Sequence, residues 1–182
     1  QNGYKNLSKL SSLSYSRFTR KRNKIKYDEL KKYSDDLYIL SGGVNSEAVK
    51  GILDLENTQV RKVIEKLSKD NFFIEVPAAG RLEKARRMLF DIVRKNQSEN
   101  FVITNDIYYP NKEDAVLQKI VESIKEGSKI EGGKSENNEI LYDDMYLKSG
   151  DEIKKKFKNK EYSEFYETGI GNIEKIVENC NV

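Results

Sequence analysis

Phe101-Val102-Ile103-Thr104-Asn105-Asp106 is a short apolar run that ends in two polar residues. Aromatic and β-branched residues favour an extended strand, and Asn and Asp favour the turn that follows it. Two similar runs lie upstream, at 37–40 before Ser41-Gly42-Gly43 and at 72–76 before Pro77. The three runs therefore predict three short, buried strands.

The segments around these strands have apolar residues at helical spacing. They predict helices over 3–14, 28–33 (capped by Asp28), 45–54, 58–67 (capped by Asn57 or Thr58), 81–96, 117–124, 149–158 and 162–179. We interpret the apolar stripes of these helices as core positions. Residues 126–140 are rich in Gly, Ser and Asn and predict a flexible loop. Strands that alternate with helices indicate an α/β fold with parallel pairing.

Composition excludes several kinds of chemistry. The chain of 182 residues has no His and one Cys, so Ser-His and Cys-His nucleophile pairs and an intramolecular disulfide are excluded within it. We interpret Cys180 as an inert side chain, because no base lies near it in the sequence. No run approaches the roughly 20 apolar residues of a membrane span. We therefore expect a soluble, cytoplasmic protein without a membrane partner.

The net charge of +3 is unevenly distributed. Residues 1–32 contain ten basic and two acidic side chains, a net +8, which leaves −5 for the remainder. Most of this excess lies in 17–26, where the candidate contacts to nucleic acid are Arg17, Arg20, Lys21, Arg22, Lys24 and Lys26. Such a run binds phosphates in some proteins and is a solvated loop in many others. We favour the solvated loop.

Several motifs occur in a fixed order along nearly the whole chain. They are Gly3-Tyr4-Lys5-Asn6-Leu7-Ser8-Lys9-Leu10-Ser11-Ser12, Leu37-Tyr38-Ile39-Leu40-Ser41-Gly42-Gly43, Phe73-Ile74-Glu75, Thr104-Asn105-Asp106-Ile107-Tyr108-Tyr109, Glu113-Asp114-Ala115, Met145-Tyr146-Leu147-Lys148-Ser149 and the segment 172–182. Together they resemble the polymerase-and-histidinol-phosphatase (PHP) domain of the bacterial DNA polymerase III alpha subunit. The resemblance covers the later part of that domain. It implies that residues 1–182 are a fragment of a single PHP domain whose N-terminal strands are missing.

The resemblance also implies a fold and a site. PHP domains are distorted (βα) barrels that gather metal ions through His, Asp, Glu and Cys ligands, so we expect a partial, distorted barrel here. Among the four matching ligand positions, the family's Cys is replaced by Gly43 and its two His residues by Ala79 and Tyr108. Only Asp106 is retained, and a Tyr phenol is a poor ligand because its ordinary pKa is about 10.

Three further features each have a functional and a structural interpretation. Asp106 is a residual metal ligand or part of the turn after a strand. Ser41-Gly42-Gly43 is a phosphate cradle or a tight turn. Glu75 is a catalytic carboxylate or a strand residue, and it has no partner carboxylate in the sequence. We favour the structural interpretation of each.

The leading hypothesis is a structural and interaction module of a replicative polymerase with a degenerate metal site. The resemblance implies that the parent protein is a DNA-directed DNA polymerase using Mg²⁺, whereas this fragment has no cofactor and no catalytic residue. The expected partners are the rest of the alpha subunit, the proofreading exonuclease subunit, and DNA through the parent. One alternative is a metal-dependent phosphoesterase whose ligands lie mostly in the missing half. Another is a nucleic-acid-binding module that uses residues 17–26.

Overall fold

The computed structural model describes residues 1–16, 25–43, 71–78, 83–95, 99–127, 130–131, 134–135, 144–158 and 162–180. The helices predicted over 45–54 and 58–67 lie outside these ranges. So does the basic run, except for Ile25 and Lys26. None of the helices within the described ranges is both long and apolar enough to cross a bilayer.

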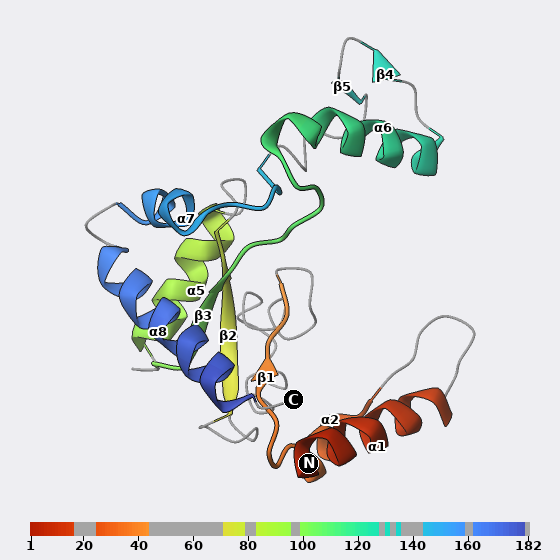
Figure 1. Ribbon diagram of the computed structural model, residues 1–182, viewed down its shortest axis with the longest axis vertical. Helices are drawn as coiled ribbons and strands as arrows, with labels where there is room; N and C mark the ends of the chain where they lie inside the picture. The colour runs from red at the N-terminus through yellow and green to blue at the C-terminus, as the bar shows by residue number, and fades with distance from the viewer. Residues whose placement is uncertain are drawn as a thin grey trace.

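Three parallel strands form the centre of the fold (Figure 1). They are β1 (Ile39–Leu40), β2 (Phe72–Pro77) and β3 (Phe101–Thr104), in the order β1-β2-β3. Ile39 pairs with Phe72, and Ile74 pairs with Phe101. The predicted α/β class and parallel pairing are confirmed, and the sheet that these strands form is open. β1 is shorter than predicted and lies at the edge, where Leu40 is 44% exposed, so the prediction of a buried first strand is wrong.

Six α-helices, the short 3-10 helix η2 (Lys112–Asp114) and a second, two-stranded pair complete the described structure. The α-helices are α1 (Asn2–Ser16), α2 (Tyr27–Lys32), α5 (Glu83–Lys95), α6 (Ala115–Glu126), α7 (Gly150–Lys156) and α8 (Ser163–Asn179), and the paired strands are the antiparallel β4 (Ile130–Glu131) and β5 (Lys134–Ser135). The β4–β5 pair occurs inside the segment predicted as a loop. Asp28 does not cap α2, because it lies in the first turn and the Lys26 main-chain N–H donates to Glu29 Oε2 at 3.0 Å instead.

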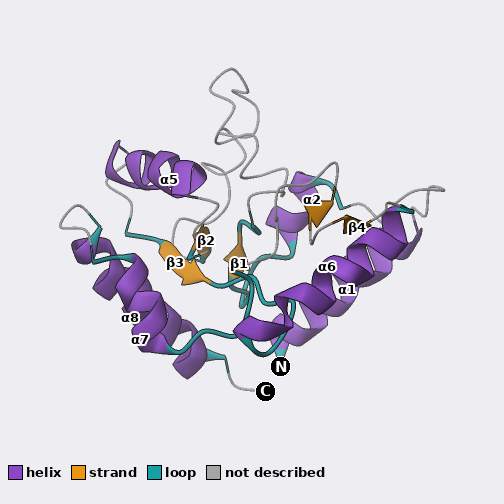
Figure 2. Cartoon of the chain, turned by 90° about the horizontal axis from the view of Figure 1, so that it is seen from above, coloured by secondary structure: helices purple, strands orange, loops and turns teal. Residues whose placement is uncertain are grey.

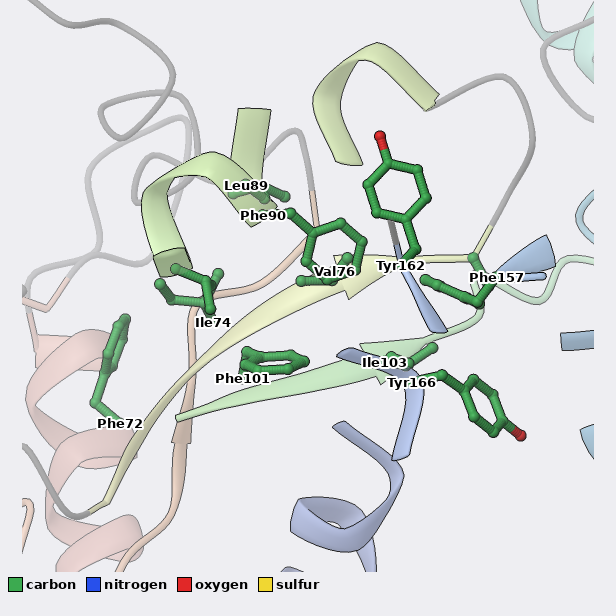
Figure 3. Packing of buried hydrophobic residues seen from close by; sticks show 12 residues of the cluster. Phe72, Ile74, Val76, Leu89, Phe90, Phe101, Ile103, Phe157, Tyr162 and Tyr166 are labelled. Atoms are coloured by element: carbon green, nitrogen blue, oxygen red, sulfur yellow. The ribbon is translucent and has the colours of Figure 1, made fainter. Parts of the chain in front are cut away.

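The main core is aromatic and lies where α5 and α8 meet the sheet (Figure 3). The Phe90 ring of α5 lies 4.6 Å from Phe165 and 5.1 Å from Tyr162, measured between ring centroids. It also meets Phe101 of β3 and Phe157 edge to face, both at 6.1 Å. Such pairs contribute about 0.5–1.5 kcal/mol each beyond the burial of their area. Viewed from above, β2 and β3 lie between α5 and α8 (Figure 2).

α8 approaches β3 closely because position 169 is a glycine. A Cβ atom at Gly169 would lie 2.9 Å from Ile103 Cγ1 and 3.0 Å from Phe101 Cε2. The Asn172 side-chain amide donates to the carbonyls of Glu99 and Phe101, at 2.7 and 2.8 Å. These bonds fix the start of β3 against α8.

The apolar stripe of α6 is not a core position, contrary to the prediction, and the stripe of α1 is one only in part. On α6, Leu117 is 61% exposed and Ile124 is 76% exposed, and Figure 1 shows this helix standing apart from α5 and α8. On α1, Leu7 is 55% exposed although Leu10 is buried. A helical pattern specifies which side of a helix is apolar, but burial also requires an element that covers that side.

Candidate functional site at the carboxyl edge of the sheet

The residues that follow the three strands lie at one edge of the sheet. Parallel strands point the same way, so Ser41–Gly43 after β1, Ala78 after β2 and Asn105–Asp106 after β3 share this carboxyl edge. The Ala78 N–H donates to the Thr104 carbonyl at 2.8 Å and continues the β2–β3 pairing beyond Pro77. The parallel pairing of the strands therefore brings these residues to the same edge.

Glu75 holds the turn after β1. Its Oε1 atom accepts the Gly42 N–H at 3.0 Å, and its own N–H donates to Ser41 Oγ at 2.9 Å. Gly42 has a φ of 79°, a conformation that favours glycine. Because the Gly42 amide already donates to a carboxylate, it is not directed at a bound phosphate. These contacts agree with the structural interpretation of Glu75 and of the Ser-Gly-Gly turn.

Two of the predicted ligand positions meet at this edge. A Cβ atom at Gly43 would lie 3.8 Å from Asp106 Oδ1 and 4.0 Å from Oδ2. A side chain at position 43 would therefore contact the Asp106 carboxylate. Ala79 lies outside the described residues, and the Tyr108 side chain is 53% exposed. Across the part of the chain that the structure describes, no group of three or more His, Cys, Asp and Glu side chains could hold a metal ion.

Lys148 is a buried cation that the sequence did not reveal as a site residue. Its side chain is fully buried, and its Nζ atom contacts Asn105 Oδ1 at 3.1 Å, Asp144 Oδ1 at 3.4 Å and the Asp144 main-chain carbonyl. The Nζ atom also lies 4.4 Å from the centroid of the Tyr146 ring. Burial lowers the pKa of Lys148, and the Asp144 carboxylate opposes that shift. In a chain with 33 Lys and Arg, one lysine after an apolar Met-Tyr-Leu run carries little signal.

The segment that carries Lys148 is fixed by a second set of bonds. The Tyr146 hydroxyl donates to Glu152 Oε1 at 2.7 Å, and the Ser149 N–H donates to Glu152 Oε2 at 2.9 Å. The bond to Glu152 raises the pKa of Tyr146 to about 12. The same bond, followed by those from Ser149, lowers the pKa of Glu152 to about 2. Each partner thus favours the protonation state that keeps the bond, a phenol donating to a carboxylate.

The predicted nucleic-acid contacts Arg17, Arg20, Lys21, Arg22 and Lys24 lie outside the described residues. Lys26 is exposed at the start of α2. Nearby, α1 and Tyr33 line an open groove of about 550 Å³, whose wall includes Lys9. The ammonium groups of Lys9 and Lys32 lie 5.5 and 5.3 Å from the centroid of the Tyr33 ring. Contact with nucleic acid through the basic run stays a prediction.

Comparison with known proteins finds relatives of this sequence. The family model described as "PHP domain" matches residues 1–79. The DNA polymerase III subunit alpha of Buchnera aphidicola subsp. Schizaphis graminum is 31% identical across the whole of this chain, and that of Treponema pallidum is 27% identical, also across the whole chain. The Borreliella burgdorferi subunit is 30% identical over 83% of this chain. The chain spans 16%, 15% and 13% of the lengths of these three relatives, respectively. Residues 1–79 thus match the PHP-domain family, and the chain as a whole is similar to bacterial DNA polymerase III alpha subunits.

Proposed function

We propose that this chain is a structural and interaction module of a replicative DNA polymerase alpha subunit, and that its PHP metal site is degenerate. The full-length relatives are named as DNA polymerase III alpha subunits, so the proposed parent activity is template-directed DNA synthesis with Mg²⁺. The proposed partners are the rest of that subunit, the proofreading exonuclease subunit, and DNA bound by the parent in the cytoplasm. The open sheet is proposed as part of a distorted PHP barrel.

The observation that carries the proposal is the pair Gly43 and Asp106. Their positions adjoin at the carboxyl edge, where two ligands of one metal would need to be, yet Gly43 has no side chain and so supplies no side-chain ligand atom. Ala79 likewise has no side-chain donor, and the Tyr108 phenol is a poor ligand near neutral pH. One carboxylate is too few to hold a metal cluster that activates water.

The test measures metal in the intact alpha subunit that carries this chain. We expect no stoichiometric zinc or manganese by elemental analysis, and no phosphoesterase turnover. An Asp106→Asn variant should match the wild type in both measurements and in polymerase activity. Stoichiometric metal that disappears in Asp106→Asn would overturn the proposal and favour the alternative, a phosphoesterase with most of its ligands in another part of the subunit.

A gain-of-function variant makes this test sharper. Gly43 does not have a positive φ, so a Gly43→Cys substitution introduces a thiol beside Asp106 without the strain of a left-handed backbone. Combined with Ala79→His and Tyr108→His, it restores the family's ligand type at three positions. If the substituted side chains are what the site lacks, the triple variant should bind zinc more tightly than the wild type does. Equal zinc binding by both would show that these positions do not determine metal binding.

A second candidate function is contact with DNA phosphates through residues 17–26. The observation that favours it is the groove beside α1, whose lining includes Lys9 and Ser16, the residue directly before the basic run. Each phosphate contact steepens the dependence of binding on salt by about one unit in a log–log plot. In a gel-shift titration, Arg20→Gln with Arg22→Gln should reduce that slope by about two, and Lys175→Gln on α8 is the control. No shift at low salt would exclude this function.

A further inference from the structure

The carboxyl edge of the sheet contains two buried cationic side chains. Lys148 approaches the end of β3, where its ammonium group meets Asn105, and its side chain is fully buried. Arg86 of α5 approaches the end of β2, where its Nη1 atom donates to the Ala78 carbonyl at 3.4 Å. Arg86 is 5% exposed, and its guanidinium lies 5.3 Å from the centroid of the Phe157 ring. Both strands are thus followed at the same edge by a cation that contacts an oxygen and an aromatic ring.

A fully buried ammonium group is unusual, because lysine is rarely buried completely unless its charge is paired. The three N–H groups of Lys148 face three oxygens of different kinds: an amide oxygen of Asn105, and a carboxylate oxygen and the main-chain carbonyl of Asp144. The Tyr146 ring lies close to the same ammonium. Oxygens of these kinds are also the ligands that small, hard cations take in proteins.

These contacts join two segments that are far apart in the sequence. Asn105 follows β3, and its Nδ2 atom also donates to the Tyr146 carbonyl at 2.9 Å. Asp144 is held from its other side by Lys156 of α7, whose Nζ lies 2.9 Å from Asp144 Oδ2. Between these contacts, the Tyr108 N–H donates to the Met145 carbonyl at 2.8 Å, and the Leu147 N–H donates to the Tyr109 carbonyl at 3.2 Å. The Lys148 ammonium lies at the junction of the two segments.

We propose that this set of oxygens is an internal cation site, and that the Lys148 ammonium occupies it and fastens residues 144–149 to the end of β3. The site adjoins Asp106 in the chain but does not use that carboxylate. It therefore does not depend on whether the PHP metal site is degenerate. The cation in the site is the Lys148 ammonium of the chain itself. Once the lysine side chain is removed, a small organic ammonium ion would be able to take its place.

The experiment follows hydrogen exchange in the intact alpha subunit. The main-chain amides of Tyr108 and Leu147 report directly on the junction, and the Ile74 amide, bonded to the Asn100 carbonyl at 3.1 Å, reports on the sheet. In Lys148→Met, the junction amides should exchange about ten to a hundred times faster, since a buried acceptor loses its partner. The Ile74 amide should be unchanged. Lys154→Met, which removes an exposed lysine of α7, is the matched control.

A rescue experiment separates the charge from simple packing. Lys148→Ala removes the equivalent of propylammonium, so added propylammonium should slow exchange at Tyr108 and Leu147 toward the wild-type rate. Neither 1-propanol nor tetramethylammonium at the same concentration should do so. A buried charge can sometimes be replaced by an apolar side chain without loss of stability. Unchanged exchange of the Tyr108 and Leu147 amides in Lys148→Met would therefore show that the ammonium does not fasten the junction, and it would overturn the proposal. Equal rescue by 1-propanol would overturn it as well.

Discussion

α5 and α6 are amphipathic helices of 13 and 12 residues, but only α5 buries its apolar face. Leu89 and Phe90 of α5 are completely buried, whereas Leu117 and Ile124 of α6 are mostly exposed. α5 lies beside β2, and its Phe90 ring reaches Phe165 of α8, whereas Figure 1 shows α6 extending away from them next to β4 and β5. The difference is in what surrounds each helix, since both have the sequence pattern of a helix with one apolar side.

This contrast shows where the described structure derives its stability. The α5 side chains interlock with rings from β3 and α8, so removing one leaves a cavity in a close-packed region. The exposed α6 side chains have little packing to lose within the described part of the chain. Substitutions of similar chemistry in the two helices should therefore have very different costs.

The largest expected effect is that of Phe90→Ala. It removes a ring that meets four other rings, so we expect the free energy of unfolding to fall by about 3–5 kcal/mol. The matched change on α6, Leu117→Ala, should cost at most about 0.5 kcal/mol, as for other exposed positions. Urea unfolding of the 182-residue chain measures both. Similar losses for the two variants would refute the contrast between the helices.

The next effect tests how tightly α8 packs against β3. Gly169→Ala places a methyl group 2.9 Å from Ile103 Cγ1, and we expect a net loss of about 1–2 kcal/mol despite the better helix propensity of alanine. Gly171→Ala on the same helix has nothing within 4 Å of its new methyl group. It should stabilise the chain by about 0.5–1 kcal/mol. In urea titrations, the two substitutions should thus change the free energy of unfolding in opposite directions. A gain for both would mean that α8 and β3 can move apart at little cost to accept the methyl group.

The sequence was sufficient to predict the elements that depend on local pattern. The run Phe101–Thr104 is a strand with the predicted bounds, because its residue types favour extension and Asn105 follows as a turn residue. α1, α5 and α8 lie within a few residues of their predicted ranges. The apolar face of α6 could also be predicted from the sequence. Its exposure to solvent could not, because exposure depends on segments that are distant in the chain.

The candidate site likewise combines positions that the sequence identified with contacts that depend on distant segments. The sequence identified Gly43 and Asp106 as matching positions, and the structure brings them together at the ends of β1 and β3. It gave no sign that Glu75 would accept the Gly42 amide or that Lys148 would be buried against Asn105. Those contacts join residues 33 and 43 positions apart. No periodicity or motif spacing reports such pairs, because they arise from the parallel arrangement of the strands and from the return of the chain after α6.

A smaller effect concerns the exposed face of α6 itself. Leu117→Gln with Ile124→Gln should change the free energy of unfolding by less than about 1 kcal/mol in total, because each side chain is already mostly in water. The same double variant should reduce the binding of a fluorescent hydrophobic dye, since it removes part of an exposed apolar patch. Leu89→Gln on α5 is the destabilising control. A loss above about 2 kcal/mol for the double α6 variant would mean that this face is covered.

The smallest effect at neutral pH concerns the Tyr146–Glu152 bond, in the segment that returns from α6 to the core. The pKa of Glu152 is about 2, against an ordinary value of 4.5, chiefly because it accepts the Tyr146 hydroxyl. A depressed carboxyl pKa stabilises the fold fully above about pH 4.5, and this contribution is lost as the pH falls toward 2. The pKa of Tyr146 is about 12, against 10, so its contribution is fully present below pH 10 and is lost as the pH rises from 10 to 12. Glu152→Gln should therefore flatten the fall in unfolding free energy between pH 4.5 and 2.5, measured by urea midpoints, whereas Glu164→Gln on the exposed side of α8 should not. An unchanged acid slope in Glu152→Gln would show that solvent screens the carboxylate so strongly that the bond does not help to hold α7 beside the core.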